Sequence, residues 1–321
     1  MLLRKIGIDC NITLEESSLY VSTCMPLIST FTLRLIFELL NFSHLFLRHL
    51  EFHFTEGFGS NIFLFLSPLL DSLELYNISG FEDTVLRPFL ASLLSSRQML
   101  RRFVLRSGRM PADILKKCFV QFKQLRSVEL SNAALMTDFS LWKTLGTLPS
   151  LKNFTVEVDD PESHPAHAPE NSNGQSGGLR YLDALESLHF TGPFFVIPHL
   201  MDSPCLESIE VSPCHHDSER EHEPGDLLTP SMMIVASKWS RSLKELKIGK
   251  YEIGITHRNS KFLMPLVDLH ELRKLDLVGW RMEKNHDALR RLSWPKLNHW
   301  DCFGVCMLEV SIEHLFPYHQ I

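Results

Sequence analysis

The sequence lacks the short motifs that mark nucleotide-binding sites. It has no G-x-x-x-x-G-K-[ST] phosphate loop and no G-x-G-x-x-G dinucleotide motif. Histidine and cysteine are plentiful, but none of them lies in a pattern typical of a nucleophile beside its base. These absences argue against an enzyme, so no catalytic residue and no cofactor is expected.

Long apolar runs are also missing. No stretch approaches 18 uncharged apolar residues, which argues against a transmembrane helix. The first residues lack the apolar core and the small-residue cleavage site of a signal peptide. The 7 cysteines show no regular spacing. Without a secretion signal they indicate reduced thiols in an intracellular protein, either cytoplasmic or nuclear.

The chain has no basic run interleaved with aromatic residues. Its formal net charge is −6 over 321 residues, and its isoelectric point is about 6.2. A chain of this charge is not expected to bind nucleic acid or an anionic membrane. Hydrophobic residues make up 44% of the chain, an ordinary fraction for a folded protein.

One six-residue phrase, with apolar residues at positions one, four and six, returns along most of the chain. It is plainest at Leu125–Leu130. The phrases start 21 to 37 residues apart, about 28 on average, which is the upper end of the leucine-rich repeat range. A weaker copy occupies Leu3, Ile6 and Ile8. Ten copies begin at Leu47, Leu70, Leu100, Leu125, Leu151, Leu185, Leu206, Leu243, Leu272 and Leu297.

The phrase predicts a β-strand that buries one face. Positions four and six lie two residues apart, so they share a face of a strand, and stacked parallel strands bury that face together. The segments between phrases have helical spacing at 82–95, 111–119, 137–145, 229–239 and 282–292. This alternation predicts an α/β leucine-rich repeat solenoid, a horseshoe with about eleven parallel strands on its concave face and helices on its convex face.

Three further segments of the first repeats carry expectations. A first strand is expected at Leu3–Ile8, and a degenerate repeat is expected within residues 9–46. A buried helix is expected at Phe31–Leu40.

Two polar stretches interrupt the repeats, at about 159–178 and 212–225. Neither has much to bury, so both are expected to be loops within a single domain of residues 1–321. Their histidines and Cys214 suggest an alternative, a metal-binding or enzymatic protein with its site in these loops. The residue types suit zinc, but no second cysteine pair or spaced histidine pair completes a known structural site, so no metal is expected.

Position five of the phrase is expected on the concave, solvent-facing side. Six of its ten residues are acidic, and neighbouring strands about 4.8 Å apart bring Glu51 close to Glu74 and Asp276 close to Asp301. One interpretation is a solvated face whose acids are offset by bases at position two. The other is a polar groove that binds a protein. The candidate partner-binding residues are Glu51, Glu74, Arg102, Glu129, Asn153, His189, Glu210, Lys247, Asp276 and Asp301.

The phrases Leu100–Leu105 and Leu125–Leu130, with irregular spacing and polar insertions, resemble the leucine-rich repeat region of F-box-like proteins expanded in mushroom-forming fungi. The resemblance implies a ribonuclease-inhibitor-like fold whose repeats hold the substrate of an SCF-type ubiquitin ligase. In that family an N-terminal F-box engages the Skp1 adaptor.

No F-box segment is found, because the first strand-like phrase begins at Leu3. Skp1 and cullin are therefore expected as partners only if an F-box is supplied elsewhere. The resulting hypothesis is a monomeric, non-enzymatic scaffold that binds another protein.

Overall fold

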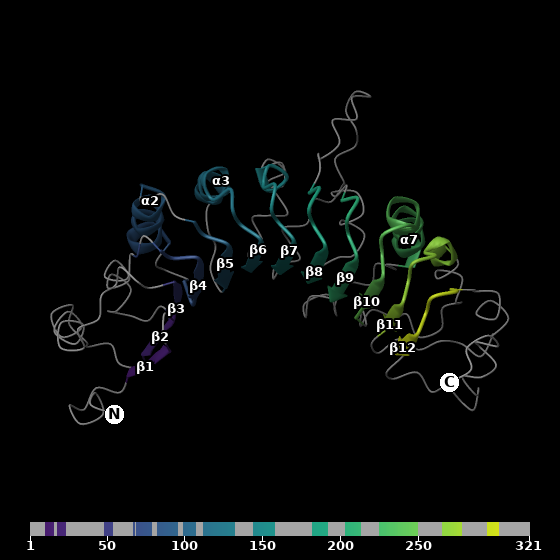
Figure 1. Ribbon diagram of the computed structural model, residues 1–321, viewed down its shortest axis with the longest axis horizontal. Coiled ribbons are helices and arrows are strands. Elements are labelled where there is room, and N and C mark those ends of the chain that lie inside the picture. The colour runs from purple at the N-terminus through teal and green to yellow at the C-terminus, as the bar shows by residue number, and fades with distance from the viewer. Residues whose placement is uncertain are drawn as a thin grey trace. The chain divides into compact units, whose positions relative to one another are not determined.

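The computed structural model (Figure 1) describes most of the repeat region. The chain divides into two compact units, Met1–Val156 and Glu157–Ile321. The single domain expected from the sequence stays a prediction. The described residues are 10–15, 18–23, 48–53, 67, 69–78, 82–95, 99–106, 112–131, 144–157, 182–191, 203–212, 225–249, 265–277 and 294–301.

Every one of the ten leucine phrases forms a strand, and each strand begins at position three of its phrase. This confirms the strand prediction, since the apolar positions four and six then follow as alternate residues. The first unit contains β3 His49–His53, β4 Ser72–Tyr76, β5 Arg102–Arg106, β6 Ser127–Ser131 and β7 Asn153–Glu157. The second contains β8 Ser187–Thr191, β9 Ser208–Ser212, β10 Glu245–Ile248, β11 Lys274–Leu277 and β12 His299–Asp301.

The strands of each unit pair in chain order with phrase position against phrase position. In the first unit Leu50 is opposite Leu73, which is opposite Phe103 on the next strand. In the second unit Leu246 lies between Ile209 and Leu275. All these side chains are buried, so equal positions in the phrase stack into one apolar core per unit.

The N-terminal end of the sheet departs from the parallel arrangement. Strands β1, Cys10–Glu15, and β2, Ser18–Thr23, form an antiparallel hairpin. Strand β2 then pairs in parallel with β3, and Leu19 and Val21 take the places opposite Leu50 and Phe52. The degenerate repeat expected in residues 9–46 is therefore β2, with Glu16 where the other phrases have leucine.

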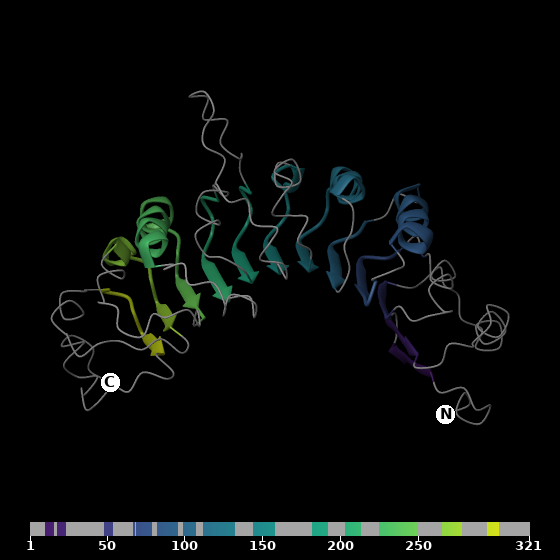
Figure 2. The ribbon, with the colours of Figure 1, turned by 180° about the vertical axis from the view of Figure 1, so that it is seen from behind.

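Helices return the chain between strands. In the first unit a π-helical turn at Glu82–Leu86 runs into α2, Arg87–Ser95, and α3 spans Ala112–Gln121. Both helices lie on the same side of β3–β6 (Figures 1 and 2). The buried side chains Ile114, Leu115, Cys118 and Phe119 share one face of α3, as amphipathic spacing requires.

In the second unit α7, Gly225–Trp239, begins four residues before the expected start at Thr229. Pro230 therefore lies inside the helix, where it has no backbone N–H to donate. The missing hydrogen bond is the one to the Asp226 carbonyl in the first turn, so the helix loses a single bond.

A backbone ladder fixes the approach to each strand. The carbonyl oxygen at position two accepts two hydrogen bonds, from the backbone N–H groups at positions two and three of the next phrase. The Arg101 oxygen, for example, accepts from Arg126 at 2.7 Å and from Ser127 at 3.0 Å. The same pair of bonds is made by Arg48, Asp71, Arg101 and Arg126 in the first unit, and by Glu186, Glu207, Lys244 and Arg273 in the second.

Parallel strands that alternate with helices, one strand to each leucine phrase, make this chain an α/β leucine-rich repeat solenoid. Several expected elements lie outside the described residues: the strand at Leu3–Ile8, the helices at 31–40 and 282–292, most of the helix at 137–145, the polar stretch at 159–178, and all but the end residues of the polar stretch at 212–225.

Candidate functional site

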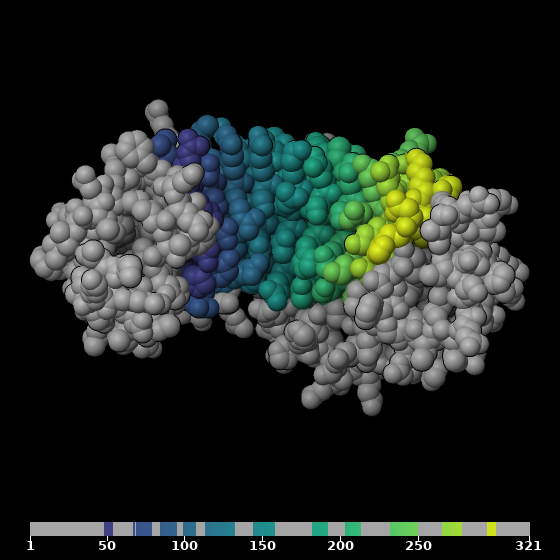
Figure 3. Space-filling model, turned by 60° about the horizontal axis from the view of Figure 1, so that its bottom comes forward, coloured from purple at the N-terminus to yellow at the C-terminus, as the bar shows by residue number. Residues whose placement is uncertain are grey.

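The polar side chains of strands β3–β6 gather on the side of the sheet away from α2 and α3. Alternate residues of a strand share a face, so positions three, five and seven of the phrase line this side. We call it the polar strand face. In Figure 3 these strands lie as neighbouring bands in chain order. Its residues are His49, Glu51, His53, Ser72, Glu74, Tyr76, Arg102, Val104, Arg106, Ser127, Glu129 and Ser131.

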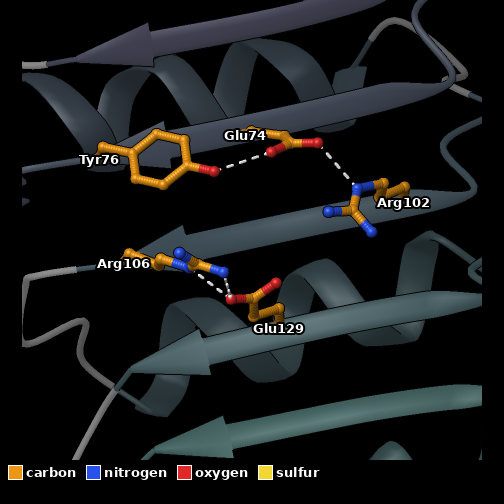
Figure 4. A network of polar contacts seen from close by, with 5 residues as sticks. All are labelled: Glu74, Tyr76, Arg102, Arg106 and Glu129. Atoms are coloured by element: carbon orange, nitrogen blue, oxygen red, sulfur yellow. Dashed lines mark hydrogen bonds and ion pairs between the residues drawn. The ribbon is translucent and has the colours of Figure 1, made fainter.

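Glu74 is the centre of a hydrogen-bonded cluster on this face (Figure 4). Arg102 donates from Nε to Glu74 Oε1 at 2.8 Å, across from β5 to β4. Tyr76 donates its hydroxyl hydrogen to the other carboxylate oxygen at 2.9 Å. Both oxygens of Glu74 are therefore engaged, which fixes the carboxylate in one orientation.

The Tyr76 ring lies between a histidine and an arginine. The His53 ring stacks on it with the centroids 4.5 Å apart and the planes 9° from parallel. The Arg106 guanidinium lies 5.6 Å from its centroid, within cation–π range. Arg106 also pairs with Glu129 on β6, and His53 Nε2 lies 2.9 Å from Glu51 Oε1. The contacts therefore link four successive strands.

Burial and hydrogen bonding act in opposite directions on the pKa of Glu74. Burial raises it, but hydrogen bonds from Arg102 and Tyr76 outweigh burial and bring it below its ordinary value. Burial and the same hydrogen bond raise the pKa of Tyr76 to about 12. Glu74 is therefore ionised and Tyr76 neutral at physiological pH, which preserves the bond between them.

Position five proves less exposed than the sequence predicts. Val104 is fully buried, and Glu74 and Asp276 are also buried, although all three were expected to face solvent. Val104 lies in register between Glu74 and Glu129. On its own strand it lies between Arg102 and Arg106, whose guanidinium groups pair with those two carboxylates. An apolar side chain at this position is thus enclosed by two ion pairs.

The two signs of charge are unequally exposed. The Glu74 and Glu129 side chains are 11% and 15% exposed, whereas those of Arg102 and Arg106 are 44% and 49% exposed. The bases that pair with these acids come from positions three and seven of β5, and not from position two. Solvent therefore meets guanidinium groups where the sequence suggests a row of carboxylates.

The second unit carries a separate polar row at position five. Glu210 accepts from Lys247 Nζ at 2.5 Å, and its other oxygen lies 3.1 Å from His189 Nδ1. Burial acts to raise the pKa of Glu210, but Lys247 and His189 lower it overall. Asp276 follows next in register, opposite Lys247 on one side and Asp301 on the other. Glu210 thus lies in register between His189 and Lys247, and Lys247 lies between the two carboxylates of Glu210 and Asp276.

The predicted site residues accordingly fall into separate groups. Glu51, Glu74, Arg102 and Glu129 come together on the polar strand face. Asn153 is exposed at the start of β7. His189, Glu210, Lys247, Asp276 and Asp301 follow one another in register in the second unit. Their role in binding a partner stays a prediction.

Sequence reasoning missed position seven, which contributes His53, Tyr76 and Arg106. The leucine pattern ends at position six, so by itself it draws no attention to the residue that follows. The signal was present, since the alternation of a strand continues to position seven and puts it on the same face as positions three and five.

The loop alternative falls on residues that the structure does not describe. Cys214, His215, His216 and His222 belong to 213–224, and His164 and His167 belong to 158–181. Within the described ranges no group of three or more His, Cys, Asp or Glu side chains is placed to hold a metal ion. No helix in those ranges has the length and apolar character needed to cross a bilayer.

The undescribed segment 158–181 also contains Gly174-Gln175-Ser176-Gly177-Gly178, which has the spacing of a G-x-S-x-G nucleophile turn. That motif supports catalysis where it joins a strand to a helix. Here it follows a long run rich in Pro, Ser and Asn, so no catalytic role is assigned to Ser176.

Comparisons with known proteins match the chain only at the level of structure. No protein-family model and no curated protein matches it. One similar solved structure is TLR13 in a complex with ssRNA13, with 16% identity and a TM-score of 0.46 over 87% of this chain and 36% of that one. The chain thus spans about a third of the TLR13 chain. Another is LegL7, a leucine-rich repeat-containing protein from Legionella pneumophila, with 13% identity and a TM-score of 0.41 over 92% of this chain and 88% of that one.

Proposed function

We propose that this chain is a non-enzymatic scaffold that binds another protein through the polar strand face. The observation that carries the proposal is the fixed Tyr76 side chain. Its ring lies between His53 and Arg106, and its hydroxyl is bonded to Glu74. Tyrosine and arginine are enriched among the residues that dominate the energy of protein interfaces.

The order already present in the free chain supports this proposal. Binding normally costs the entropy of immobilising flexible side chains, and ion pairs that hold Arg102 and Arg106 in place reduce that cost. A solenoid also supplies a continuous surface, because every repeat contributes a strand to it.

A narrower form of the proposal is substrate recognition for an SCF-type ubiquitin ligase. It is supported by the resemblance of the leucine phrases to those of F-box-like proteins. In this form the strands hold the substrate, and an F-box supplied elsewhere engages Skp1 and cullin.

The test is affinity purification from the native cell followed by mass spectrometry, with three forms of the full chain. The wild type is expected to capture a protein that the Tyr76→Ala/Arg106→Ala variant loses. The control is Lys117→Ala on α3, an exposed residue on the helical side of the first unit. It is expected to retain the protein.

Three outcomes of this experiment test the proposal. Skp1 and cullin among the captured proteins support the ligase form. A captured protein that the control loses as readily as the face variant moves the site away from the polar strand face. Failure of the wild type to capture any protein reproducibly overturns the scaffold proposal itself.

A further inference from the structure

Exposed bases gather where the strands of the first unit begin. Each is at position two or three of its phrase, and each is exposed. We call this group the basic edge, and it consists of Arg48, Arg101, Arg102, Arg126 and Lys152. The single acidic residue at the same positions of β3–β7 is Asp71.

The backbone ladder holds this edge in order. The Arg101 carbonyl oxygen accepts from the N–H of Arg126, and the Arg126 oxygen accepts from the N–H of Lys152. Neighbouring strands of a sheet are about 4.8 Å apart, so these three bases follow one another at that interval. The edge is therefore a regular row on a fixed backbone.

Equal positions in the second unit do not share this character. Positions two and three of β8–β12 hold three acids, Glu186, Glu207 and Glu245, and three bases, Lys244, Arg273 and Lys274. The whole chain carries a net charge of −6. A run of five exposed bases against one acid is thus a local feature of the first unit, opposite in sign to the chain as a whole.

The polar strand face extends the positive surface because its acids are recessed. Arg102 belongs to both regions, and it uses Nε to bond Glu74 while 44% of its side chain is exposed. Its two terminal nitrogens make no hydrogen bond or ion pair with another residue that the structure describes. These two nitrogens are therefore available as donors to a second acceptor, which a carboxylate of a partner would supply.

Two exposed apolar side chains border the basic edge. Leu69 and Met99 precede the first leucines of their phrases and are 46% and 51% exposed. Their repeats are neighbours, since the Asp71 oxygen accepts from the N–H of Arg101. Large exposed apolar side chains beside a charged row suit the apolar side chains of a polypeptide.

We propose that the basic edge binds an acidic segment of a partner protein, with an apolar side chain of that segment against Leu69 and Met99. The proposal rests on the protein-binding function above and names the chemistry of its partner. Glutamate or aspartate side chains pair with Arg101, Arg102 and Arg126, and arginine's planar fork matches a carboxylate through two hydrogen bonds.

The charge and side chains of the chain favour a polypeptide over a nucleic acid. A long polyanion would extend past the basic edge and be repelled by the rest of the chain, because the whole chain carries a net charge of −6. Single-stranded nucleic acid is generally held by aromatic side chains that stack on its bases. The aromatic residues next to the edge in sequence, Phe52, Phe103 and Phe154, are buried in the core and offer no ring for such stacking.

The test measures the fluorescence anisotropy of a labelled peptide, made of glutamates and two leucines, as the full chain is added. There are three counter-probes. The first peptide has lysine in place of glutamate, the second has serine in place of leucine, and the third probe is an oligothymidylate of equal charge. The variant is Arg126→Glu. Its matched control is Arg273→Glu in the second unit, because both arginines are exposed at position two and both carbonyls accept the same pair of backbone bonds.

The glutamate–leucine peptide is expected to bind more tightly than every counter-probe, and more weakly as salt is raised. Arg126→Glu is expected to weaken binding at least about fivefold, because it places a negative charge against the acidic peptide. Arg273→Glu is expected to weaken it less than about twofold, because Arg273 does not belong to the basic edge. Equal melting curves show that both variants remain folded.

Other results overturn the inference. They are absence of binding at about 1 mM peptide, equal losses in the two variants, or tighter binding of the lysine peptide or the oligothymidylate. A natural partner that is captured by the wild type and equally by Arg126→Glu would leave the scaffold proposal standing and remove the basic edge from it.

Discussion

Trp239 donates its indole N–H to the carbonyl oxygen of Ser203 at 3.0 Å, deep in the second unit. The bond joins the last residue of α7 to the turn in front of β9. Trp294 makes the same kind of bond to Leu266 at 2.7 Å, two repeats further on. Each tryptophan thus satisfies a carbonyl in the turn that precedes an earlier strand, and fills the core beside it.

Replacement of Trp239 by phenylalanine tests that bond. The substitution keeps an aromatic ring in the core but leaves the buried Ser203 carbonyl without its indole donor. The carbonyl still accepts from the Leu206 N–H at 3.2 Å, so we expect loss of the indole bond to lower the free energy of unfolding by about 0.5–1.5 kcal/mol, in addition to the cost of the smaller ring. Urea denaturation measures it. Met233→Ala, at an exposed position of the same helix, should change stability by less than about 0.5 kcal/mol.

Leu130 tests the facing of the strands. It is fully buried at position six of β6, so Leu130→Ala should cost about 2–5 kcal/mol. Its neighbour Glu129 points to the other face and pairs with Arg106, whose side chain is half exposed. Glu129→Ala should therefore cost only about 0–1 kcal/mol. Equal shifts of the two denaturation midpoints would show that the two positions do not face opposite sides.

Tyr76 should titrate late in alkali. Its folded-state pKa is raised to about 12 from an ordinary value of 10.0, so the folded state holds the proton more tightly than the unfolded state. Its contribution to stability is present below pH 10 and is lost as the pH rises toward 12. The difference in phenolate absorbance between the wild type and Tyr76→Phe isolates this group. In Glu74→Gln the phenol should ionise at lower pH, and an unchanged titration would contradict the assigned hydrogen bond.

The two described free cysteines should differ sharply in reactivity. Burial on α3 raises the pKa of the Cys118 thiol to about 12, whereas Cys205 is exposed before β9. The thiolate is the reactive form. Brief treatment of the native chain with iodoacetamide should label Cys205 and spare Cys118, as peptide mapping by mass spectrometry would show. In denaturant both should react, and early labelling of native Cys118 would refute its burial.

The leucine phrase predicted the repeats well because it encodes burial directly. Leu at position one and apolar residues at four and six determine which side of each strand enters the core, and the register follows because equal positions stack. For strand β2 the sequence predicts only a degenerate repeat somewhere in residues 9–46, because Glu16 replaces the leucine and only Leu19 and Val21 carry the pattern.

The candidate site was less predictable because ion pairs depend on contacts between repeats. The sequence gives the charges at each position, but Arg102 reaches Glu74 across 28 residues and Arg106 reaches Glu129 in the opposite direction. These pairings decide that the carboxylates are recessed and that Val104 is enclosed. Position alone would have left all of them equally exposed.

The paired backbone bonds at position two have a consequence for how the chain can change over time. Within each unit they fix the strand of one leucine phrase to that of the next, whatever the number of residues that intervene. The intervals between phrases already vary from 21 to 37 residues while the alignment of the strands stays the same. An insertion or deletion between two strands therefore lengthens or shortens a connection without shifting any outward side chain. The surface and the connecting segments are thus free to diverge independently.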